Sequence, residues 1–178
     1  LKGLCQVSSV IVPIQTTGDR ILDRHLSQLG GKGLFTLEIE EGLRDGSLDI
    51  AVHSMKDMPP SSDGDLVIQG MLKRERPEDA FISSQNLLFK NLPLGAKIGT
   101  ASLRRRSQLL SIRPDLEISL LRGNVATRLD KLRTQGLDGT LLGYGGLKRL
   151  GQEHLVTEIL DPHIMVPAPG QGAIGIQI

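Results

Sequence analysis

The sequence is poor in cysteine, in paired histidines and in aromatic residues, and each shortage excludes a class of site. Cys5 is the single cysteine of the 178-residue chain, so an internal disulfide and a multi-cysteine metal site are both excluded. The four histidines show neither HxxxH nor HExxH spacing, and we therefore expect no metal site. Three phenylalanines, one tyrosine and no tryptophan offer no stacking platform among the arginines, so we expect no nucleic-acid partner.

Long hydrophobic runs are also missing. No apolar stretch approaches the roughly 20 residues needed to cross a membrane, and the first six residues lack the apolar segment of a signal peptide. We therefore expect a cytoplasmic protein that does not associate with membranes. The hydrophobic content of 39% is enough to form a core, either in one large domain or in two small lobes.

The charge is balanced over the whole chain but unevenly distributed along it. The formal net charge is +1, whereas residues 19–65 carry 10 acids and 5 bases and residues 97–149 carry 11 bases and 4 acids. Most of these bases fall at the starts of predicted helices or in glycine-containing loops. A basic region of this kind is expected to attract an anion, and a small polycarboxylate or phosphate ligand fits it best.

Apolar runs typical of strands alternate with amphipathic segments typical of helices. The predicted strands are 7–15, 48–54, 66–71, 117–121, 139–142 and 173–178, and the predicted helices are 34–44, 102–112, 125–135 and 153–160. Strands 7–15 and 48–54 with the helix between them form a β-α-β unit, for which a parallel pair is expected. The pattern predicts an α/β fold with a lobe boundary in the charged, proline-containing stretch 73–79.

One stretch, residues 52–59, ends an apolar strand in a cluster of charge. Pro59 and Pro60 cannot prolong a strand ladder, so Lys56 and Asp57 fall directly after the strand end. Ligands of open α/β sheets bind in the crevice at the carboxyl ends of strands, which makes this pair a candidate for chemistry. The alternative interpretation is a solvated turn.

Further candidate anion-binding positions lie where glycine or a strand end precedes a helix. Glycines on both sides of Lys32 precede the helix at 34–44 and could let the backbone approach an anion at the start of that helix. The alternative interpretation is a flexible segment that leads into the helix. Ser102 or Thr100 is expected to cap the helix that carries Arg104 and Arg105. The alternative there is a surface helix with ordinary basic residues. Two later junctions between a strand and the next helix carry further bases: Arg122, Arg128 and Arg149. Together with the start of the helix at 102–112, they are expected to place a row of bases along one edge of the sheet.

Seven blocks of the sequence, taken in order, resemble the porphobilinogen deaminase (hydroxymethylbilane synthase) family: residues 17–19, 30–35, 52–59, 99–105, 122–124, 146–151 and 170–172. The resemblance implies an α/β fold of two lobes like a type II periplasmic-binding-protein fold, with the active site in the cleft between them. Residues 1–72 would form the first lobe, completed by a returning strand at 174–178, and residues 73–173 the second, basic lobe. By this resemblance, we expect the chain to lack an N-terminal segment and the third domain of the family.

The resemblance also implies a function. Members of this family are transferases of tetrapyrrole (haem) biosynthesis that join four porphobilinogen molecules into the linear hydroxymethylbilane and release ammonia. They act as monomers and use a dipyrromethane cofactor, which a thioether attaches to a cysteine of the third domain. Cys5 does not match that cysteine, and we expect the 178-residue chain alone to be inactive. The alternative is a non-catalytic two-lobe binding module for a small polycarboxylate anion.

Matching positions suggest roles for individual residues. Asp57 matches the catalytic aspartate of the family. The positions that match substrate- and cofactor-binding side chains are Lys32, Ser54, Lys56, Thr100, Ser102, Arg104, Arg105, Arg122, Arg128, Arg149 and Gln171. Several positions depart from the usual pattern: among them, Ala101 replaces a serine, Leu37 a basic residue and Pro169 a small aliphatic residue. We expect Ala101 to remove one hydroxyl donor and Pro169 to stiffen the turn.

Overall fold

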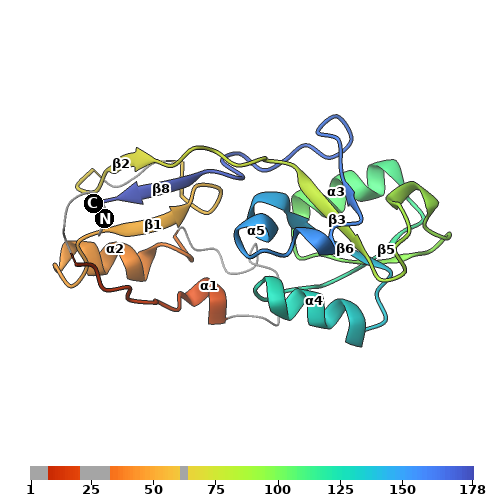
Figure 1. Cartoon of the computed structure of the whole chain (residues 1–178), viewed down its shortest axis with the longest axis horizontal. Helices are drawn as coiled ribbons and strands as arrows, with labels where there is room; N and C mark the ends of the chain where they lie inside the picture. Colours follow the sequence, from red (N-terminus) through yellow and green to blue (C-terminus); the bar gives the residue numbers. More distant parts are fainter. Residues whose placement is uncertain (1–7, 21–32, 61–63) are drawn as a thin grey trace.

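The computed structural model describes residues 8–20, 33–60 and 64–178. Cys5 and Lys32 lie outside the described residues, as do the first glycines of the 30–33 stretch. Within the described part, the strands form two separate sheets, each accompanied by helices (Figure 1). The fold is therefore of the mixed α/β class, as the sequence predicts.

The smaller sheet has three strands, and its central strand comes from the end of the chain. Its strand order is β1 (Ala51–Ser54), β8 (Ile174–Gln177) and β2 (Ile68–Met71). β8 runs antiparallel to both neighbours, with Ser54 opposite Ile174 and Met71 opposite Gly175. The strand predicted at 173–178 is thus confirmed, and it joins segments more than a hundred residues earlier in the chain.

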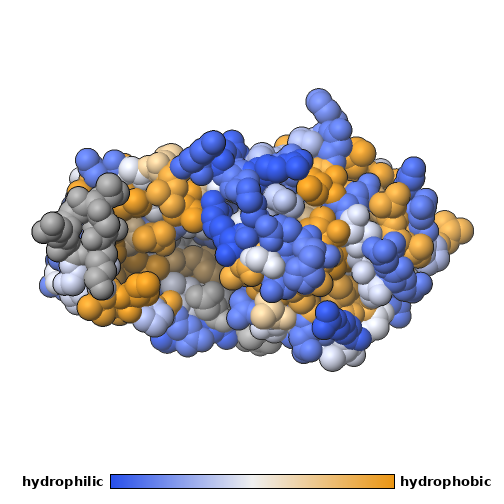
Figure 2. All heavy atoms as spheres, in the orientation of Figure 1, coloured by the Kyte–Doolittle hydropathy of each residue, from blue (hydrophilic) through white to orange (hydrophobic). Residues whose placement is uncertain are grey.

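The predicted strand at 7–15 and its parallel pairing are wrong. Residues 8–16 form no strand, and the partner of β1 is the antiparallel β8. Pro13 removes a backbone donor from this stretch, and Val10 and Ile11 are about nine-tenths exposed. Two helices accompany the small sheet: α1 (Thr17–Arg20) and α2 (Leu37–Arg44). Apolar residues lie exposed on the β1 and β2 side of the molecule (Figure 2), among them Val52 and Met71.

The larger sheet has five strands in the order β5–β4–β6–β3–β7. Its strands are β3 (Asp79–Ser83), β4 (Lys97–Gly99), β5 (Glu117–Ser119), β6 (Gly139–Gly143) and β7 (Glu158–Ile159). β4 runs parallel to β5 and β6, whereas β3 runs antiparallel to β6 and β7. The three parallel strands lead into the helices α3 (Leu103–Ile112), α4 (Val125–Thr134) and α5 (Tyr144–Arg149). Helices therefore begin along one edge of the sheet, as the sequence predicts.

The predicted helix at 153–160 is wrong. Residues Glu153–Leu155 form a single 3-10 turn, η3, after which the chain enters β7. β7 pairs with β3 through Ile159 opposite Ala80 and Glu158 opposite Phe81. Pairing with strand β3 therefore determines the conformation of this stretch, although its sequence has a weak helical pattern. A second short 3-10 helix, η2 (Phe89–Asn91), precedes β4.

The hydrophobic core lies on both faces of the five-stranded sheet. Phe81 packs into one cluster with Ile98 and Leu109, whereas its neighbours Ala80 and Ile82 pack into the other. This alternation follows from the period of two along a strand, and it makes both faces of the sheet apolar. Burial of each large side chain contributes about 1.5–3 kcal/mol, so the sheet is a firm support for the helix starts at its edge.

Two segments connect the sheets and lie side by side. The backbone N–H of Leu72 donates to Ile174, and that of Glu75 donates to Gly172, which places the crossing from β2 to β3 against the crossing into β8. Gly172 has a φ of +85°, and a Cβ there would lie 2.4 Å from the carbonyl oxygen of Glu75. The close approach of the two crossings therefore requires glycine at this position.

Candidate functional site

A cleft of about 870 Å³ lies where residues of both parts of the chain meet. The turn after β1 contributes Lys56 and Asp57, and the other lining residues come mostly from the starts of α3 and α4. Eight of the residues predicted from the sequence line this cleft: Lys56, Asp57, Ser102, Arg104, Arg105, Arg122, Arg128 and Gln171. Lining residues that the sequence reasoning did not single out include Phe35, Asn124 and Thr127.

The other predicted positions lie elsewhere. Ser54 is exposed on β1 and is not among the lining residues. Thr100 is buried, and its hydroxyl accepts a hydrogen bond from the backbone N–H of Ser102, which shapes the start of α3. Arg149 ends α5 and donates to the carbonyl oxygen of Gly172. Through these hydrogen bonds, Thr100 and Arg149 hold the backbone of Ser102 and Gly172 in place.

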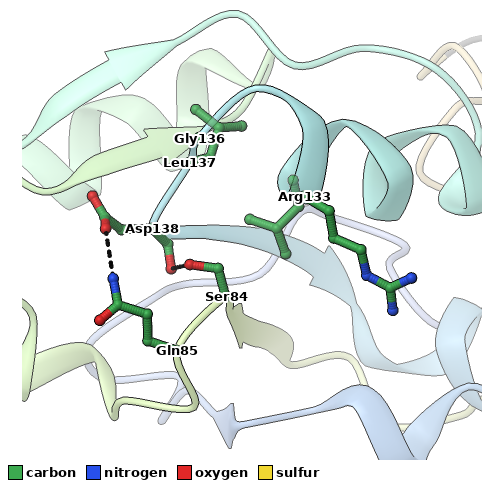
Figure 3. A pocket seen from close by; sticks show the side chains of 7 residues that line it. Ser84, Gln85, Arg133, Gly136, Leu137 and Asp138 are labelled. Carbon is green, nitrogen blue, oxygen red and sulfur yellow. Dashed lines mark hydrogen bonds between the residues drawn. The ribbon is translucent and has the colours of Figure 1, made fainter.

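A smaller pocket of about 380 Å³ contains none of the predicted residues (Figure 3). It lies between the end of α4 and the residues that follow β3, and its walls include Arg133, Gly136 and Asp138. Side chains already pair across it, because Gln85 donates to the Asp138 carboxylate and Ser84 donates to the Asp138 carbonyl oxygen. The pocket therefore offers few free polar groups, and the larger cleft is the candidate site.

The strand end after β1 is a hydrogen-bonded turn. The N–H of Asp57 donates to the carbonyl oxygen of Ser54 at 2.9 Å, and the N–H of Met55 donates to Ala173. Lys56 is exposed on this turn, and its side chain lines the cleft. Loss of hydration there lowers the pKa of Lys56, and Arg105 and Arg128 lower it further, against the opposing effect of Asp57.

The starts of α3 and α4 are both capped by side chains in the wall of the cleft. Ser102 Oγ accepts from the N–H of Arg105 at 3.3 Å, as the sequence predicts for the start of α3. Asn124 Oδ1 accepts from the N–H of Thr127 at 2.8 Å and caps α4. Both ten-residue helices thus direct the positive end of their dipoles toward the same cleft.

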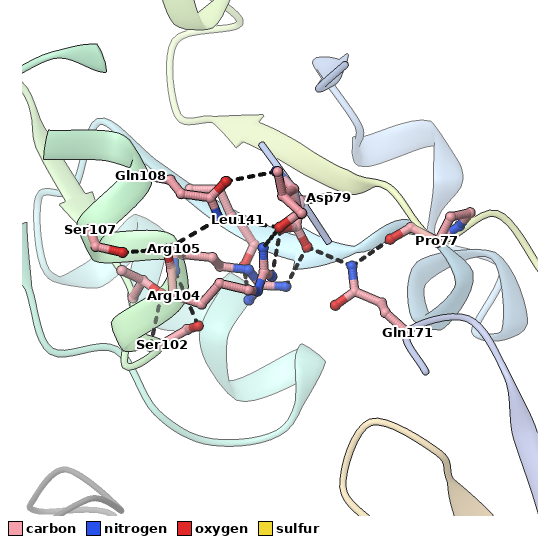
Figure 4. A network of polar contacts seen from close by, with 11 residues as sticks. Pro77, Asp79, Ser102, Arg104, Arg105, Ser107, Gln108, Leu141 and Gln171 are labelled. Atoms are coloured by element: carbon pink, nitrogen blue, oxygen red, sulfur yellow. Dashed lines mark hydrogen bonds and ion pairs between the residues drawn. The ribbon is translucent and has the colours of Figure 1, made fainter. Parts of the chain in front are cut away.

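Asp79 is a site residue that the sequence reasoning missed. Its carboxylate is fully buried beneath the cleft wall and accepts hydrogen bonds from Arg104, Arg105 and Gln171 at 2.7, 2.7 and 2.8 Å (Figure 4). Burial raises the pKa of Asp79, but Arg105 and Arg104 outweigh this effect and hold the pKa below its usual value. An acidic residue at the first position of an otherwise apolar strand is the signal that could have identified it.

The two remaining arginines lie at the junction of β5 and α4. Arg122 is buried and donates from Nη2 to the carbonyl oxygen of Gly18 at 3.0 Å, so it connects this junction to α1. Arg128 donates from Nε to the carbonyl oxygen of Gly123 at 2.6 Å. Burial lowers the pKa of Arg128 to about 10, and the charges of Arg105 and Arg122 contribute to the decrease.

Taken together, the walls of the cleft formed by the described residues carry five basic side chains and one carboxylate, that of Asp57. Such a site is suited to a ligand with several carboxylates, with Asp57 as the group that accepts N–H bonds or stabilises positive charge. One donor in the wall, Arg105 Nε, is buried without a hydrogen-bond partner. An unsatisfied buried donor beside a group of bases is consistent with a site that is completed by an anionic ligand.

The described residues hold no group of three or more side chains that could bind a metal ion. Among the same residues, no helix is long and apolar enough to cross a membrane. The departures from the resembled pattern are accommodated in simple ways. Ala101 lines the cleft without a hydroxyl, Leu37 opens α2 half-exposed, and Pro169 is the second residue of a turn closed by the N–H of Gln171 and the carbonyl oxygen of Ala168.

Comparison with known proteins gives a consistent result along the whole chain. Residues 1–178 match the family model described as porphobilinogen deaminase, dipyromethane cofactor binding domain. Porphobilinogen deaminases of Caulobacter vibrioides, Phenylobacterium zucineum and a Geobacter species are 54%, 55% and 53% identical over 99%, 94% and 99% of this chain. The chain spans 55%, 52% and 55% of their lengths, which is about half of the relatives that it matches.

Among solved structures, YhfZ from Shigella flexneri aligns over 79% of this chain and 64% of its own, with 18% identity and a TM-score of 0.35. This similarity is too weak to support a conclusion about the fold.

Proposed function

The chain belongs to the porphobilinogen deaminase family, and from this premise we propose that it forms the cofactor- and substrate-binding part of a transferase of tetrapyrrole biosynthesis. The whole protein joins four porphobilinogen molecules into hydroxymethylbilane and releases ammonia at each step. We further propose that it acts as a monomer in the cytoplasm. The observation that carries the proposal is the cleft itself, whose described walls hold five basic side chains together with the carboxylate of Asp57.

The charge of the cleft matches the proposed substrate. Each porphobilinogen unit carries an acetate and a propionate group, so a growing chain accumulates carboxylates. Arginine guanidinium groups bind carboxylates through paired N–H bonds, and the helix starts of α3 and α4 add the positive ends of their dipoles. The family match leaves the alternative of a non-catalytic binding module without support.

Asp57 is the group that we assign to the chemistry. As ammonia leaves the aminomethyl group of porphobilinogen, positive charge develops on the pyrrole, and an ionised carboxylate beside it lowers the energy of that state. The same carboxylate accepts the pyrrole N–H and orients the ring. Lys56, its neighbour in the turn, points its charge toward substrate carboxylates and favours the ionised form of Asp57.

The residues of the cleft also fit a dipyrromethane cofactor. The unsatisfied Arg105 Nε and the basic lining offer donors for its carboxylates, and Arg104, Arg105, Arg122 and Ser102 are the residues that would hold it. When bound, the cofactor supplies the terminal pyrrole to which the first porphobilinogen is joined. We do not assign Cys5 as its attachment point, and we place that cysteine in the part of the protein beyond this chain.

We propose that the two sheets belong to two lobes, residues 1–72 with 174–178 and residues 73–173. The pairing of β8 with β1 and β2 supports this division, since it returns the end of the chain to the first lobe. The contribution of residues 13–15 and 56–57 on one side and of α3 and α4 on the other supports an active site between lobes, as in type II periplasmic-binding-protein folds.

The test of the proposed function is Asp57→Ala in the full-length protein. Turnover of porphobilinogen is expected to fall by about 10²- to 10⁴-fold, the usual range for a catalytic acid–base or charge-stabilising group. Asp130→Asn, on the exposed face of α4, is the matched control and should keep wild-type turnover. Mass spectrometry of both variants should show the dipyrromethane increment. Full turnover by Asp57→Ala would remove Asp57 from the mechanism, and a wild-type protein without turnover would overturn the function.

A further inference from the structure

The buried carboxylate of Asp79 connects three separate segments of the chain (Figure 4). Asp79 Oδ2 accepts from Arg104 Nη2, and Oδ1 accepts from Arg105 Nη2 and from Gln171 Nε2. These partners lie 25, 26 and 92 residues further along the chain. The first two belong to the first turn of α3, and Gln171 belongs to the crossing that leads into β8.

Each of the two guanidinium groups is held on a second side by a backbone carbonyl. Arg104 Nη1 donates to the carbonyl oxygen of Val166, and Arg105 Nη1 donates to that of Leu141 at 3.0 Å. A guanidinium is planar and directs its N–H bonds in fixed directions, so two such contacts determine the orientation of the whole group. Both arginines are therefore oriented in the wall of the cleft before any ligand binds.

The charge of Asp79 is as important as its geometry. A carboxylate that is fully inaccessible to solvent stays ionised only where donors and positive charges compensate for its lost hydration, and here three donors do so. The positive charges of Arg104 and Arg105 would otherwise add to those of Lys56, Arg122 and Arg128 in one cleft. Asp79 offsets part of this repulsion from beneath the wall.

We propose that Asp79 is a positioning residue for ligand binding, an inference that rests on the proposed function. It holds Arg104 and Arg105 so that their remaining N–H groups meet the carboxylates of the pyrrole ligand, and through Gln171 it fixes the same pair to the crossing into β8. Because the orientation exists before binding, the ligand does not have to order these side chains, which favours affinity.

The first experiment compares Asp79→Asn with wild type in the full-length protein. The substitution keeps the shape but removes the charge, so KM for porphobilinogen is expected to rise about tenfold or more, with a smaller change in kcat. A double-mutant cycle with Arg105→Gln separates positioning from independent effects. If Asp79 acts through Arg105, the double variant loses little more than Arg105→Gln alone, whereas additive losses would overturn the proposal.

A control variant separates the loss of positioning in Asp79→Asn from a general loss of stability. Phe81→Leu lies two residues away in β3, is fully buried and makes none of the network's hydrogen bonds with its side chain, so it lowers the unfolding temperature while every donor and acceptor of the network stays in place. It should keep the wild-type KM. A rise of KM in Phe81→Leu equal to that in Asp79→Asn would assign the effect to lost stability and overturn the proposal.

A spectroscopic measurement on the wild-type protein needs no variant. In ¹⁵N-labelled full-length protein, the Nη groups of Arg104 and Arg105 are expected to give separate, slowly exchanging NMR signals, because rotation of both guanidinium groups is restricted. Free rotation there would overturn the proposal even if Asp79→Asn failed to fold. Failure of the proposed function is distinguishable, since it would appear as a wild-type protein without porphobilinogen turnover while the NMR signals still report the orientation of the arginines.

Discussion

Lys56 lines the cleft at a place where other cations lie nearby. Loss of hydration and the charges of Arg105 and Arg128 lower its pKa below the ordinary value. A protonated lysine binds carboxylates and a neutral one does not, so affinity falls as pH rises through this lowered pKa. We therefore predict that KM for porphobilinogen increases toward alkaline pH earlier than an unperturbed lysine would cause.

The matched variant for this prediction is Lys56→Arg in the full-length protein, because a guanidinium stays protonated across the same range. Measurement of KM between about pH 7 and 10 should give a rising profile for wild type and a flatter one for Lys56→Arg, since lysine normally titrates near 10.4. Identical profiles would show that the titration of Lys56 does not cause the rise of KM at alkaline pH.

Arg122 performs two tasks that a lysine cannot combine. Its Nη2 donates to the carbonyl oxygen of Gly18, and the side chain also lines the cleft. A lysine presents a single ammonium group instead of a planar fork, so Arg122→Lys keeps the charge but gives up one of the two contacts. We predict a KM about tenfold higher and a loss of about 1 kcal/mol in unfolding free energy, the size of one hydrogen bond.

The control is Arg133→Lys, which makes the same change at an exposed position of α4 outside the large cleft. It should alter neither KM nor the unfolding free energy measured in urea. An Arg122→Lys enzyme with the KM of wild type would mean that the guanidinium of Arg122 does not contact the substrate.

At this scale, the sequence predicts residues whose roles follow from local pattern. Lys56 and Asp57 follow a strand that Pro59 ends, and Arg104, Arg105 and Arg128 lie in the first turns of helices, so their approach to one cleft could be predicted. Asp79 could not, because its three partners are distant in sequence and become neighbours only after β3, α3 and the crossing into β8 have packed.

At the scale of elements, the turn at residues 168–171 determines how the crossing into β8 meets the turn after β1. Pro169 occupies the second position of this turn, and Gly170 has a φ of +69° at the third, the arrangement of a type II turn. Proline is favoured at that second position, so the departure at Pro169 is compatible with the turn. A Cβ at residue 170 would lie 2.8 Å from the carbonyl carbon of Met55.

We therefore predict that Gly170→Ala lowers the unfolding free energy by more than about 1 kcal/mol, since both the positive φ and the backbone contact oppose a side chain. The control is Gly146→Ala, in α5, where a Cβ meets nothing within 4 Å and φ is not positive. That change should be neutral or stabilising by about 0.5–1 kcal/mol, as for a glycine replaced in a helix. Equal unfolding midpoints in urea for the two variants would contradict this account of the turn.

The elements that sequence reasoning placed wrongly share a physical cause. The stretch 7–15 is apolar enough for a strand, but Pro13 interrupts its donors and the described residues offer it no partner strand. The stretch 153–160 has a weak helical pattern, but β3 offers a free edge that Glu158 and Ile159 join. In both cases the availability of a partner strand decides the outcome, and a single sequence does not contain that information.

At the scale of the whole molecule, the cleft takes residues from parts of the chain that two crossings connect. The crossings pair through Leu72 with Ile174 and Glu75 with Gly172, so a narrow ribbon joins the sheets, and among the described residues no core cluster extends over both of them. Both core clusters contain only residues that lie between the two crossings or in the second one. A ligand that contacts both sides of the cleft is then expected to draw them together.

We predict a shorter distance between Glu41 in α2 and Asp130 in α4 when the full-length protein binds porphobilinogen-derived pyrroles. Both residues are exposed, one on each side of the cleft. Spin labels carried by unnatural amino acids avoid thiol reagents, which would also modify Cys5, and double electron–electron resonance then measures the distance. The control pair, Asp130 and His163, lies within the part built on the five-stranded sheet and should keep its distance. An unchanged distance between residues 41 and 130 would mean that the cleft binds its ligand as a rigid body, with the arginines and Asp57 already at their final separation.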